Sequence, residues 1–419
     1  MRDSVTFIHT ADLHLDAPFQ GIGNASERVG RALAESTYDA FRRIVDVAIA
    51  RDVDFVVIAG DAYNSRDKSL RAQLRFREQA NRLAEAGIPV FVAHGNHDPA
   101  SGWSAGLSLP STVRVFASDR VERFEVVRDG VVLAAVYGRS FGRGAETENL
   151  ALGFQREAAD ELAIGVLHAN VGSNSEYDPY APATLDDLRA AGMDYWALGH
   201  IHKHEVLARD PWAVYAGSPQ GLSPNETGPH GCLVVEAVNA GAFSTEHVET
   251  ASIAWARVDL DVGAAGDLDA VRSLVADACE ELLGREGRHV VARFRLTGRS
   301  ESHADLAQPG ACADLLDHIR AELGAGDPWL WVDRLEDRTS AVLDMGAIRA
   351  GRDFATEVVR VADELAADPA LLSELIAEVA APVATALTGD SARDASGAEA
   401  ALAAARDAVL DQLLGGEVR

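Results

Sequence analysis

Near its amino-terminal end the chain reads FIHTADLH over residues 7–14, an apolar run that leads straight into polar residues. A short apolar run of this kind is typical of a buried strand. Asp12 and His14 follow two residues apart, so along an extended chain both side chains point the same way and can reach one ion. In layered α/β folds, ligand sites assemble at the carboxyl ends of the strands. This stretch therefore predicts a strand that carries two candidate metal ligands to the edge of a sheet.

Short strands alternate with helices from Val5 to about Val238, which indicates an α/β layered domain. The strands that we expect are residues 6–9, 55–59, 89–93, 131–136, 163–167 and 195–198. Ser26 is expected to cap a first helix, and a second helix is expected from about residue 69 to 86, ending at Gly87. Several of the strands run into Asp, His or Asn, so polar clusters gather at one edge of the domain.

The pattern changes beyond Val238. A polar stretch, residues 239–252, leads to a smaller α/β unit with helices near 268–283 and 312–323 and strands near 290–296 and 330–334. From Met345 onward the chain is rich in Ala, Leu, Asp and Glu and predicts helices alone. We therefore predict three domains, at residues 1–250, 251–344 and 345–419.

Composition limits the kind of protein this can be. With 419 residues the chain is long enough for two or three domains, and its 25% of charged residues is ordinary for a globular protein. Its three widely spaced cysteines exclude a disulfide framework. The formal charge of −27 means that any contact with nucleic acid needs a local basic patch. The sequence shows neither a membrane span nor a secretory signal, so we expect a cytoplasmic protein.

Five polar clusters contain the candidate chemistry. In order they are Asp12-Leu13-His14, Gly60-Asp61, Gly95-Asn96-His97-Asp98, His168 and Gly199-His200-Ile201-His202. Each is a weak signal alone, but two divalent cations about 3.5–4 Å apart need such a set of carboxylate, amide and neutral imidazole ligands. The seven candidate ligands are Asp12, His14, Asp61, Asn96, His168, His200 and His202. The glycines at 60, 95 and 199 leave room where backbone must crowd the ions.

These clusters, in this order, resemble the motifs D-x-H, G-D, G-N-H-D, H and G-H-x-H of the calcineurin-like metallophosphoesterase superfamily. Residues 7–19, 199–204 and 215–220 resemble, more narrowly, its DNA-repair exonuclease branch of the SbcD and YhaO type. The resemblance covers about residues 5–238. It implies a two-sheet α/β sandwich metallophosphoesterase domain, followed by a smaller α/β capping domain and a helical C-terminal tail.

The resemblance also implies how the ligands divide. The equivalents of Asp12, His14, Asp61 and His202 bind a first ion, and those of Asp61, Asn96, His168 and His200 bind a second, which makes Asp61 the bridge. Related nucleases use manganese. The ligand types suit manganese physically and leave iron and zinc open.

The implied reaction is hydrolysis of a phosphodiester by a hydroxide that two metal ions activate. His97 is the candidate to protonate the leaving oxygen or to bind the transferring phosphate. We expect Asp98 to orient His97 and keep it cationic, the alternative being a turn residue before Pro99. Asn64 stands where some recombination nucleases carry a histidine that positions DNA, so it either bonds a phosphate or closes a turn.

A short basic stretch after Asp61 is the candidate DNA contact, and a solvated helix face is its alternative. The DNA-binding candidates are Arg66, Lys68, Arg71, Arg75, Asn64 and Lys203. The resemblance implies an SMC-like ATPase partner of the SbcC or YhaN kind. The tail's apolar positions suit docking to that partner or packing within this protein, and a homodimer stays open.

Two other functions compete with that of a nuclease acting on DNA in a repair complex. A phosphodiesterase or phosphatase for a small ester would use the same metals, although it would not need the extra domain and tail. A scaffold protein with residual metal binding is the other alternative, and the complete ligand set argues against it.

Overall fold

The computed structural model describes residues 4–19, 26–64, 68–102, 105–238, 242–323, 326–368, 370–372, 374–375 and 395–414. The chain forms two compact units. The first comprises Met1–Arg257, Cys279–Arg293 and Glu322–Arg334, and the second comprises Val258–Ala278, Phe294–Ala321 and Leu335–Arg419. Among the helices of the described residues, none has the length and apolar character that crossing a bilayer requires.

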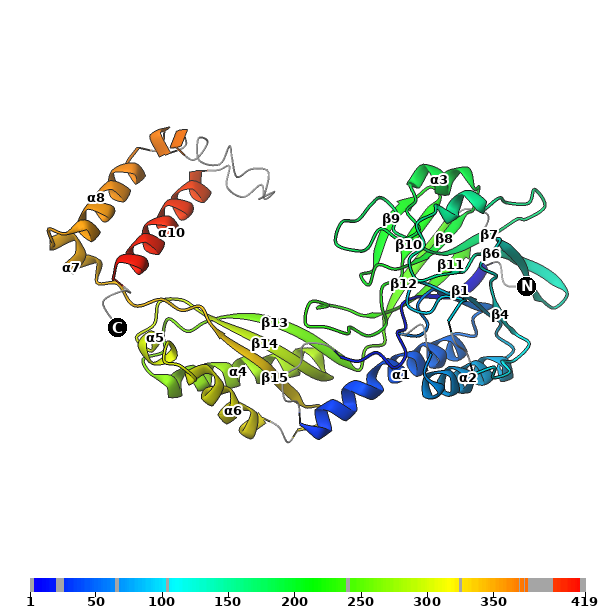
Figure 1. The fold of residues 1–419 in the computed structure, drawn as a ribbon, viewed down its shortest axis with the longest axis horizontal. Helices are drawn as coiled ribbons and strands as arrows, with labels where there is room; N and C mark the ends of the chain where they lie inside the picture. Colours follow the sequence, from blue (N-terminus) through cyan, green and yellow to red (C-terminus); the bar gives the residue numbers. More distant parts are fainter. Residues whose placement is uncertain are drawn as a thin grey trace. The chain divides into compact units, whose positions relative to one another are not determined.

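Two six-stranded sheets build most of the first unit (Figure 1). The first sheet has the order β12-β11-β1-β2-β3-β4, with β1 at Ser4–Thr10, β2 at Phe55–Ala59, β3 at Val90–Ala93, β4 at Val113–Val115, β11 at Gly231–Val238 and β12 at Ala242–Glu249. The second has the order β5-β6-β7-β8-β10-β9, with β5 at Glu122–Arg128, β6 at Val131–Gly138, β7 at Ala163–His168, β8 at Tyr195–Gly199, β9 at Glu205–Arg209 and β10 at Trp212–Tyr215. The expected two-sheet α/β fold is confirmed.

The strands that lead to the polar clusters are parallel and in register. In the first sheet, β1 pairs with β2 and β2 with β3, with Thr10 opposite Ile58 and Ala59 opposite Ala93. In the second sheet, β7 pairs with β8 and His168 lies opposite Gly199. The carboxyl ends of neighbouring strands therefore lie together within each sheet.

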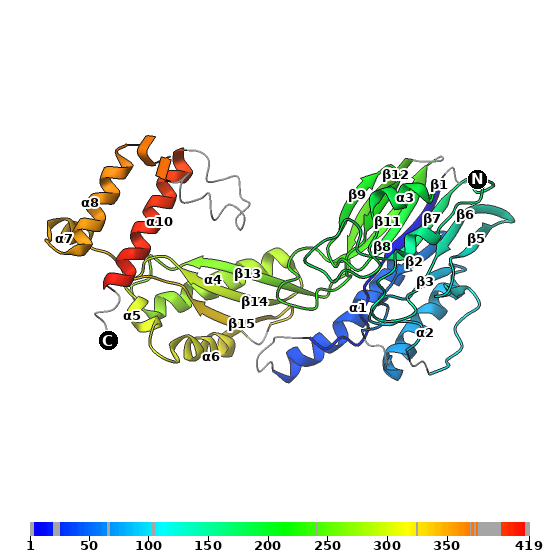
Figure 2. The same ribbon diagram turned by 45° about the horizontal axis from the view of Figure 1, so that its top comes forward.

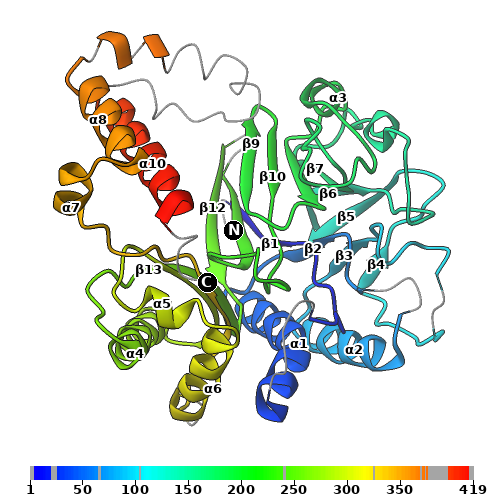
Figure 3. The ribbon, with the colours of Figure 1, turned by 60° about the vertical axis from the view of Figure 1, so that its left-hand side comes forward.

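Helices cover the outer faces of both sheets, as Figure 3 shows. Helices α1 (Glu27–Ala50) and α2 (Leu70–Glu85) pack Phe41 and Phe76 into a core with the first sheet. Helix α3 (Leu185–Ala190) packs Leu188 against the second sheet, next to the short 3-10 helix at Leu150–Gly153. A separate apolar core fills the space between the sheets. The unit is therefore a four-layer sandwich, helix–sheet–sheet–helix.

Helices α1 and α2 each begin at a serine cap. The Ser26 and Ser69 side chains accept hydrogen bonds from the backbone N–H groups of Val29 and Ala72, which satisfies donors that a helix start leaves unpaired. Gly87, at φ +74°, follows α2, as expected for a residue that ends a helix in the left-handed region.

The remaining elements lie beyond residue 250. A three-stranded sheet has the order β13-β14-β15, and the chain continues into helices. The bounds are Ile253–Asp261 (β13), Leu268–Glu286 (α4), His289–Thr297 (β14), His303–Leu306 (α5), Ala311–Leu323 (α6), Leu330–Asp337 (β15), Met345–Ala350 (α7), Phe354–Ala366 (α8) and Ala395–Leu414 (α10). Helices α8 and α10 lie side by side and share a small core at Val359 and Leu410 (Figure 2).

Three strands of the first sheet, β4, β11 and β12, are absent from our expected strands, and β12 shows why a strand can be missed. The polar stretch at 239–252 contains β12, which pairs with β11 at the edge of the first sheet. Its side chains are exposed or half-buried, because an edge strand does not pack into a core along its whole length. Without buried positions the strand lacks the apolar pattern by which sequence analysis finds strands.

Candidate metal centre

The seven candidate ligands lie at or just beyond the carboxyl ends of five strands. Asp12 and His14 follow β1, Asp61 follows β2, Asn96 follows β3, His168 ends β7, and His200 and His202 follow β8. Asp12, His14, Asp61 and His200 have positive φ, a left-handed backbone that ordinary residues seldom adopt. Such strain, about 1–3 kcal/mol per residue, typically gathers at functional sites.

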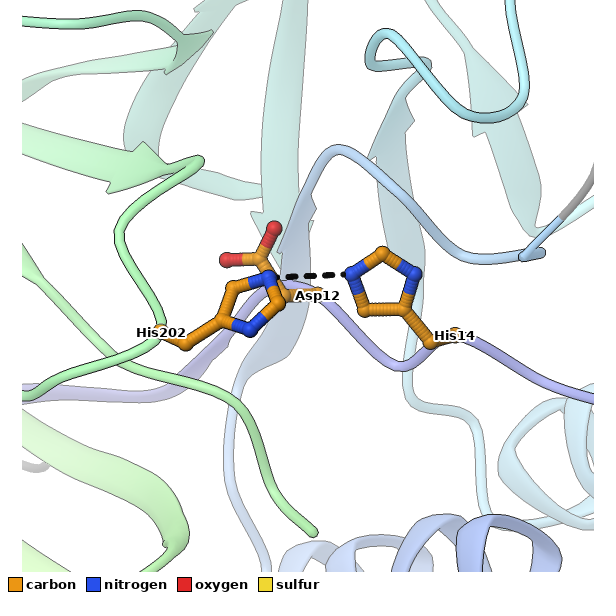
Figure 4. A group of neighbouring side chains, drawn as sticks. All are labelled: Asp12, His14 and His202. Atoms are coloured by element: carbon orange, nitrogen blue, oxygen red, sulfur yellow. Dashed lines mark hydrogen bonds between the residues drawn. The ribbon is translucent and has the colours of Figure 1, made fainter. Parts of the chain in front are cut away.

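Asp12, His14 and His202 form a first cluster, and Figure 4 shows the two imidazoles facing each other beside the carboxylate. The Nε2 atoms of His14 and His202 are 3.1 Å apart. One potential ligand atom from each of the three residues lies within 4.8 Å of the others. Asp12 and His14 are almost fully buried, and the His202 side chain is 21% exposed.

Asp12, Asp61 and His168 form a second cluster, joined by Asn96. His168 Nδ1 donates to the carbonyl oxygen of Ala59 at 3.0 Å, which leaves Nε2 with a lone pair. That Nε2 lies 2.9 Å from Asn96 Oδ1 and 3.4 Å from Asp61 Oδ2. A lone pair pointing at oxygen acceptors is repulsive unless a cation lies among them, so this geometry fits a bound metal ion.

His200 contacts the other candidate ligands through its backbone N–H and its ring. Its N–H lies 3.1 Å from Asp12 Oδ2 and donates to that carboxylate, and its ring lies 5.2 Å from the ring of His168. His200 Nε2 donates to the carbonyl oxygen of Asp178 at 2.8 Å, so the lone pair is on Nδ1. The structure therefore brings all seven candidates into one region.

Three glycines make this close approach possible. A Cβ on Gly60 would come within 2.1 Å of His168 Nδ1, and one on Gly95 within 2.3 Å of Asp61 Oδ1. A Cβ on Gly199 would lie 1.9 Å from the carbonyl oxygen of Ala59. Each distance is far below van der Waals contact, so the glycines at 60, 95 and 199 are needed to form the site.

The electrostatics of the cluster also favour a cation. Burial raises the pKa of Asp12 to about 6. Burial, followed by the charges of Asp98 and Asp12, raises the pKa of Asp61 well above its usual value. Burial lowers the pKa of His14 and His168, so their imidazoles stay neutral. Carboxylates crowded together beside neutral imidazoles suit divalent cations, which supply the missing positive charge.

Metal affinity should therefore depend on pH. A carboxyl must lose its proton to bind a metal ion, so affinity is present above the pKa of Asp12, about 6, and is lost as pH falls through it. We expect the affinity for manganese to drop about tenfold between pH 7.5 and pH 5.0 from this one group. Isothermal titration calorimetry at several pH values measures the drop. An affinity that stays constant over this range would contradict the prediction.

A cavity of about 360 Å³ opens at the site. It is lined by Asp61, Asn96, His97, Ser175, Glu176, Tyr177, Asp178, His200 and His202. His97 is exposed on its wall, where its Nδ1 donates to the carbonyl oxygen of Asn64 at 3.2 Å. The ring of His97 lies 4.8 Å from the ring of His14. His97 is therefore placed to meet a molecule that enters the cavity.

Our expectation that Asp98 orients His97 is wrong. Asp98 is buried, and its Oδ2 lies 3.2 Å from Nδ1 of His94, four residues back along the chain. The carboxylate also accepts hydrogen bonds from the backbone N–H groups of Gly95 and Tyr63. Asp98 thus fixes the loop that carries Asn96, which is close to the turn role left open as its alternative.

The structure gives less support to the candidate DNA contacts than to the candidate metal ligands. Lys68 is buried, and its Nζ lies 5.7 Å from the ring centre of Tyr63, so the expectation that it contacts DNA is wrong. Arg71 pairs with Glu35, and Arg75 approaches Glu35 and Glu78. These acidic neighbours offset much of the positive charge of the basic stretch.

The other candidates differ in what the structure shows of them. Lys203 is exposed next to His202. Asn64 contacts His97 through its carbonyl group. Arg66 lies outside the described residues.

Among the residues that sequence analysis missed, Asn170 and Glu226 contact other parts of the site. The Asn170 side chain, buried two residues after His168, donates to the carbonyl oxygens of Asn174 and Asp178 and so holds the loop that meets His200. Glu226 Oε2 lies 3.4 Å from His202 Nδ1. Asn170 lies close in sequence to the motif residue His168, which could have indicated a role in the site. Glu226 is distant in sequence from every motif, and only the fold brings it close to His202.

Comparisons with known proteins agree with this geometry. Residues 5–204 match the model of the calcineurin-like phosphoesterase family, and residues 255–340 match the middle domain of the metallophosphoesterase YhaO. The chain is 36% identical over 340 residues to the metallophosphoesterase YhaO of Bacillus subtilis, covering 81% of this chain and 83% of that one.

More distant relatives have names that refer to DNA repair or to a nuclease. The chain is 30% identical over 396 residues to the DNA double-strand break repair protein Mre11 of Haloferax volcanii, covering 86% and 82% of the two chains. It is 23% identical over 255 residues to the SbcD component of the nuclease SbcCD of Bacillus subtilis, covering 53% and 63%.

The chain belongs to the calcineurin-like metallophosphoesterase family. Within that family it falls in the branch that contains YhaO and SbcD, as the sequence motifs indicated. The expectation of a phosphoesterase with a metal-binding Asp and His cluster is thereby confirmed at the level of the family.

Proposed function

We propose that this protein hydrolyses phosphodiester bonds in DNA as the nuclease component of a bacterial DNA repair complex. The observation that carries the proposal is the convergence of the seven candidate ligands, from five strands, beside one open cavity with His97 on its wall. The names of the Mre11 and SbcD relatives support DNA as the substrate.

The ligand residues have separate tasks in this proposal. Asp12, His14, Asp61 and His202 hold one divalent ion, and Asp61, Asn96, His168 and His200 hold the other, with Asp61 shared. When bound, such ions lower the pKa of water and neutralise negative charge on a phosphate. Manganese is our proposed metal, because imidazole, carboxylate and amide ligands suit it.

His97 acts on the substrate directly. Its Nδ1–H is fixed by the Asn64 carbonyl oxygen, so Nε2 is the atom free to face the cavity. A proton on Nε2 can pass to the leaving oxygen, or the cationic ring can bind the phosphate. Because a backbone carbonyl and not a carboxylate orients the ring, His97 does not gain a fixed negative partner there.

The parts of the chain after residue 250 have roles in the same proposal. Residues 251–344 form a capping domain that selects DNA, and residues 345–419 dock onto an SMC-like ATPase of the SbcC or YhaN kind. Helices α8 and α10 support the docking role, because they border an apolar cavity of about 300 Å³ and leave Phe354 and Val361 exposed.

A second candidate is a phosphodiesterase for a small ester. Glu176 and Asp178 line the cavity, and their negative charge disfavours a polyanionic strand more than a small monoester or diester. This observation keeps the small-ester function as the alternative that the assay must exclude.

Turnover by the purified protein with manganese separates these functions. The substrates are end-labelled duplex DNA, single-stranded DNA and an aryl phosphodiester, with the Asp61→Asn variant as the metal-site control. We expect DNA to be cut by the wild-type protein alone. Strong turnover of the aryl ester with no cutting of DNA, with or without the ATPase, would establish the small-ester function. No turnover of any substrate would favour a scaffold.

A further inference from the structure

The proposed ligand His202 is held differently from His168, His200 and His97. His168, His200 and His97 each donate a ring N–H to a backbone carbonyl oxygen, of Ala59, Asp178 and Asn64 respectively. The Nδ1 of His202 faces a carboxylate instead, with Glu226 Oε2 at 3.4 Å. A carboxylate can only accept, so this contact places the proton on Nδ1 and leaves the lone pair on Nε2.

The lone pair then points into the metal site. His202 Nε2 lies 3.1 Å from His14 Nε2, in the cluster that also includes Asp12. With the proton on Nδ1, the His202 ring adds a third donor atom to this cluster. The opposite tautomer would direct an N–H at it and exclude an ion from that position.

Glu226 is itself fixed in place. Its Oε2 accepts the backbone N–H of Leu222 at 3.1 Å and its Oε1 accepts the Ser223 hydroxyl at 3.2 Å. The Glu226 carbonyl oxygen accepts from Nε2 of His230 at 3.1 Å. The side chain is 21% exposed, so its charge is only partly screened by water. A carboxylate anchored by its own turn can hold the imidazole in one orientation.

We propose that Glu226 is a positioning residue that fixes the tautomer and orientation of His202 and so strengthens one of the two metal sites. The inference rests on the proposed function, because it presumes that His202 is a metal ligand. It assigns to Glu226 a task that no motif contains, since Glu226 stands 24 residues beyond His202. Carboxylate partners of ligand histidines are known to raise the basicity of the ring and to contribute to metal affinity.

Manganese affinity measured on the full-length protein tests this proposal. We expect Glu226→Ala to weaken one of the two manganese sites by about 10- to 100-fold and to leave the other within about twofold. Glu226→Gln keeps an acceptor oxygen but removes the charge, so its affinity should lie between those of Glu226→Ala and the wild type. Glu205→Gln removes the same charge from an exposed position three residues after His202 and should bind like the wild type.

A second measurement reads the tautomer in the wild-type protein. In metal-free protein with ¹⁵N-labelled histidine, measured at alkaline pH where the imidazole is neutral, the ring nitrogen shifts of His202 should show a protonated Nδ1 and a bare Nε2. The His202→Gln variant assigns the signals. An Nε2–H tautomer in the wild type, or equal affinities in Glu226→Ala and the wild type, would overturn the role of Glu226 alone. A wild-type protein that binds no manganese would overturn the proposed function together with this inference.

Discussion

Replacing Asp61 with asparagine should abolish metal-dependent turnover and yet stabilise the metal-free protein. The buried Asp61 carboxyl has a strongly raised pKa, so its charged form is costly to the fold at neutral pH. The amide removes that cost, and we expect a rise in Tm on the order of a few degrees in EDTA. It also removes the ligand that we propose both ions share, and we expect turnover to fall by about 10³-fold or more, since bound metals supply several kcal/mol to such reactions.

Thermal melts with and without manganese, combined with the assay on labelled DNA, measure both effects. Manganese should raise the Tm of the wild type and leave the Tm of the variant unchanged. Asp119→Asn is the matched control, because it removes a carboxylate whose side chain is 73% exposed. Retained turnover in Asp61→Asn would refute the assignment of Asp61 as the bridging ligand.

Replacing His97 with alanine should separate metal binding from chemistry. His97 lies on the cavity wall and contacts the Asn64 carbonyl oxygen, so its loss leaves the seven proposed ligands in place. We expect both manganese ions to remain bound while kcat falls by about 10²- to 10⁴-fold, the usual contribution of a positioned acid or base. Metal content by mass spectrometry and steady-state kinetics on one substrate test the two halves of the prediction.

The geometry also shows which result would contradict this prediction. One ring nitrogen of His97 lies within 4.8 Å of potential ligand atoms on His14 and Asp61, so His97 could itself hold an ion. If His97→Ala loses a metal ion, His97 is a ligand and not an acid. His247→Ala removes an imidazole on β12, outside the proposed site, and should leave kcat unchanged.

Most of the strands near the site were predictable from sequence. The expected strand at 55–59 matches β2, and the one at 163–167 is one residue short of β7. These strands lie in the middle of their sheets and are buried on both faces, so they read as continuous apolar runs. The exposed edge strand β12 has no such run, and its polar residues do not give the pattern by which a strand is predicted.

The sequence predicted which residues form the site better than it predicted which of them contact each other. Asp12, His14, Asp61, Asn96, His168, His200 and His202 stand next to strand ends in the sequence, and the parallel register brings those ends together. The partner of Asp98 was not predictable, because both His94 and His97 are close to it in the chain and only the shape of the loop chooses His94. The burial of Lys68 was not predictable either, since its sequence neighbours are polar.

The sequence by itself determined the fold class, the family and the residues that gather at the strand ends, because each of these depends on short local patterns. Only the tertiary structure decided which side chains touch. Hydrogen bonds act over about 3 Å, so a shift of one residue in a loop exchanges one partner for another. Contacts such as Glu226 with His202 join residues whose distance along the chain holds no local signal.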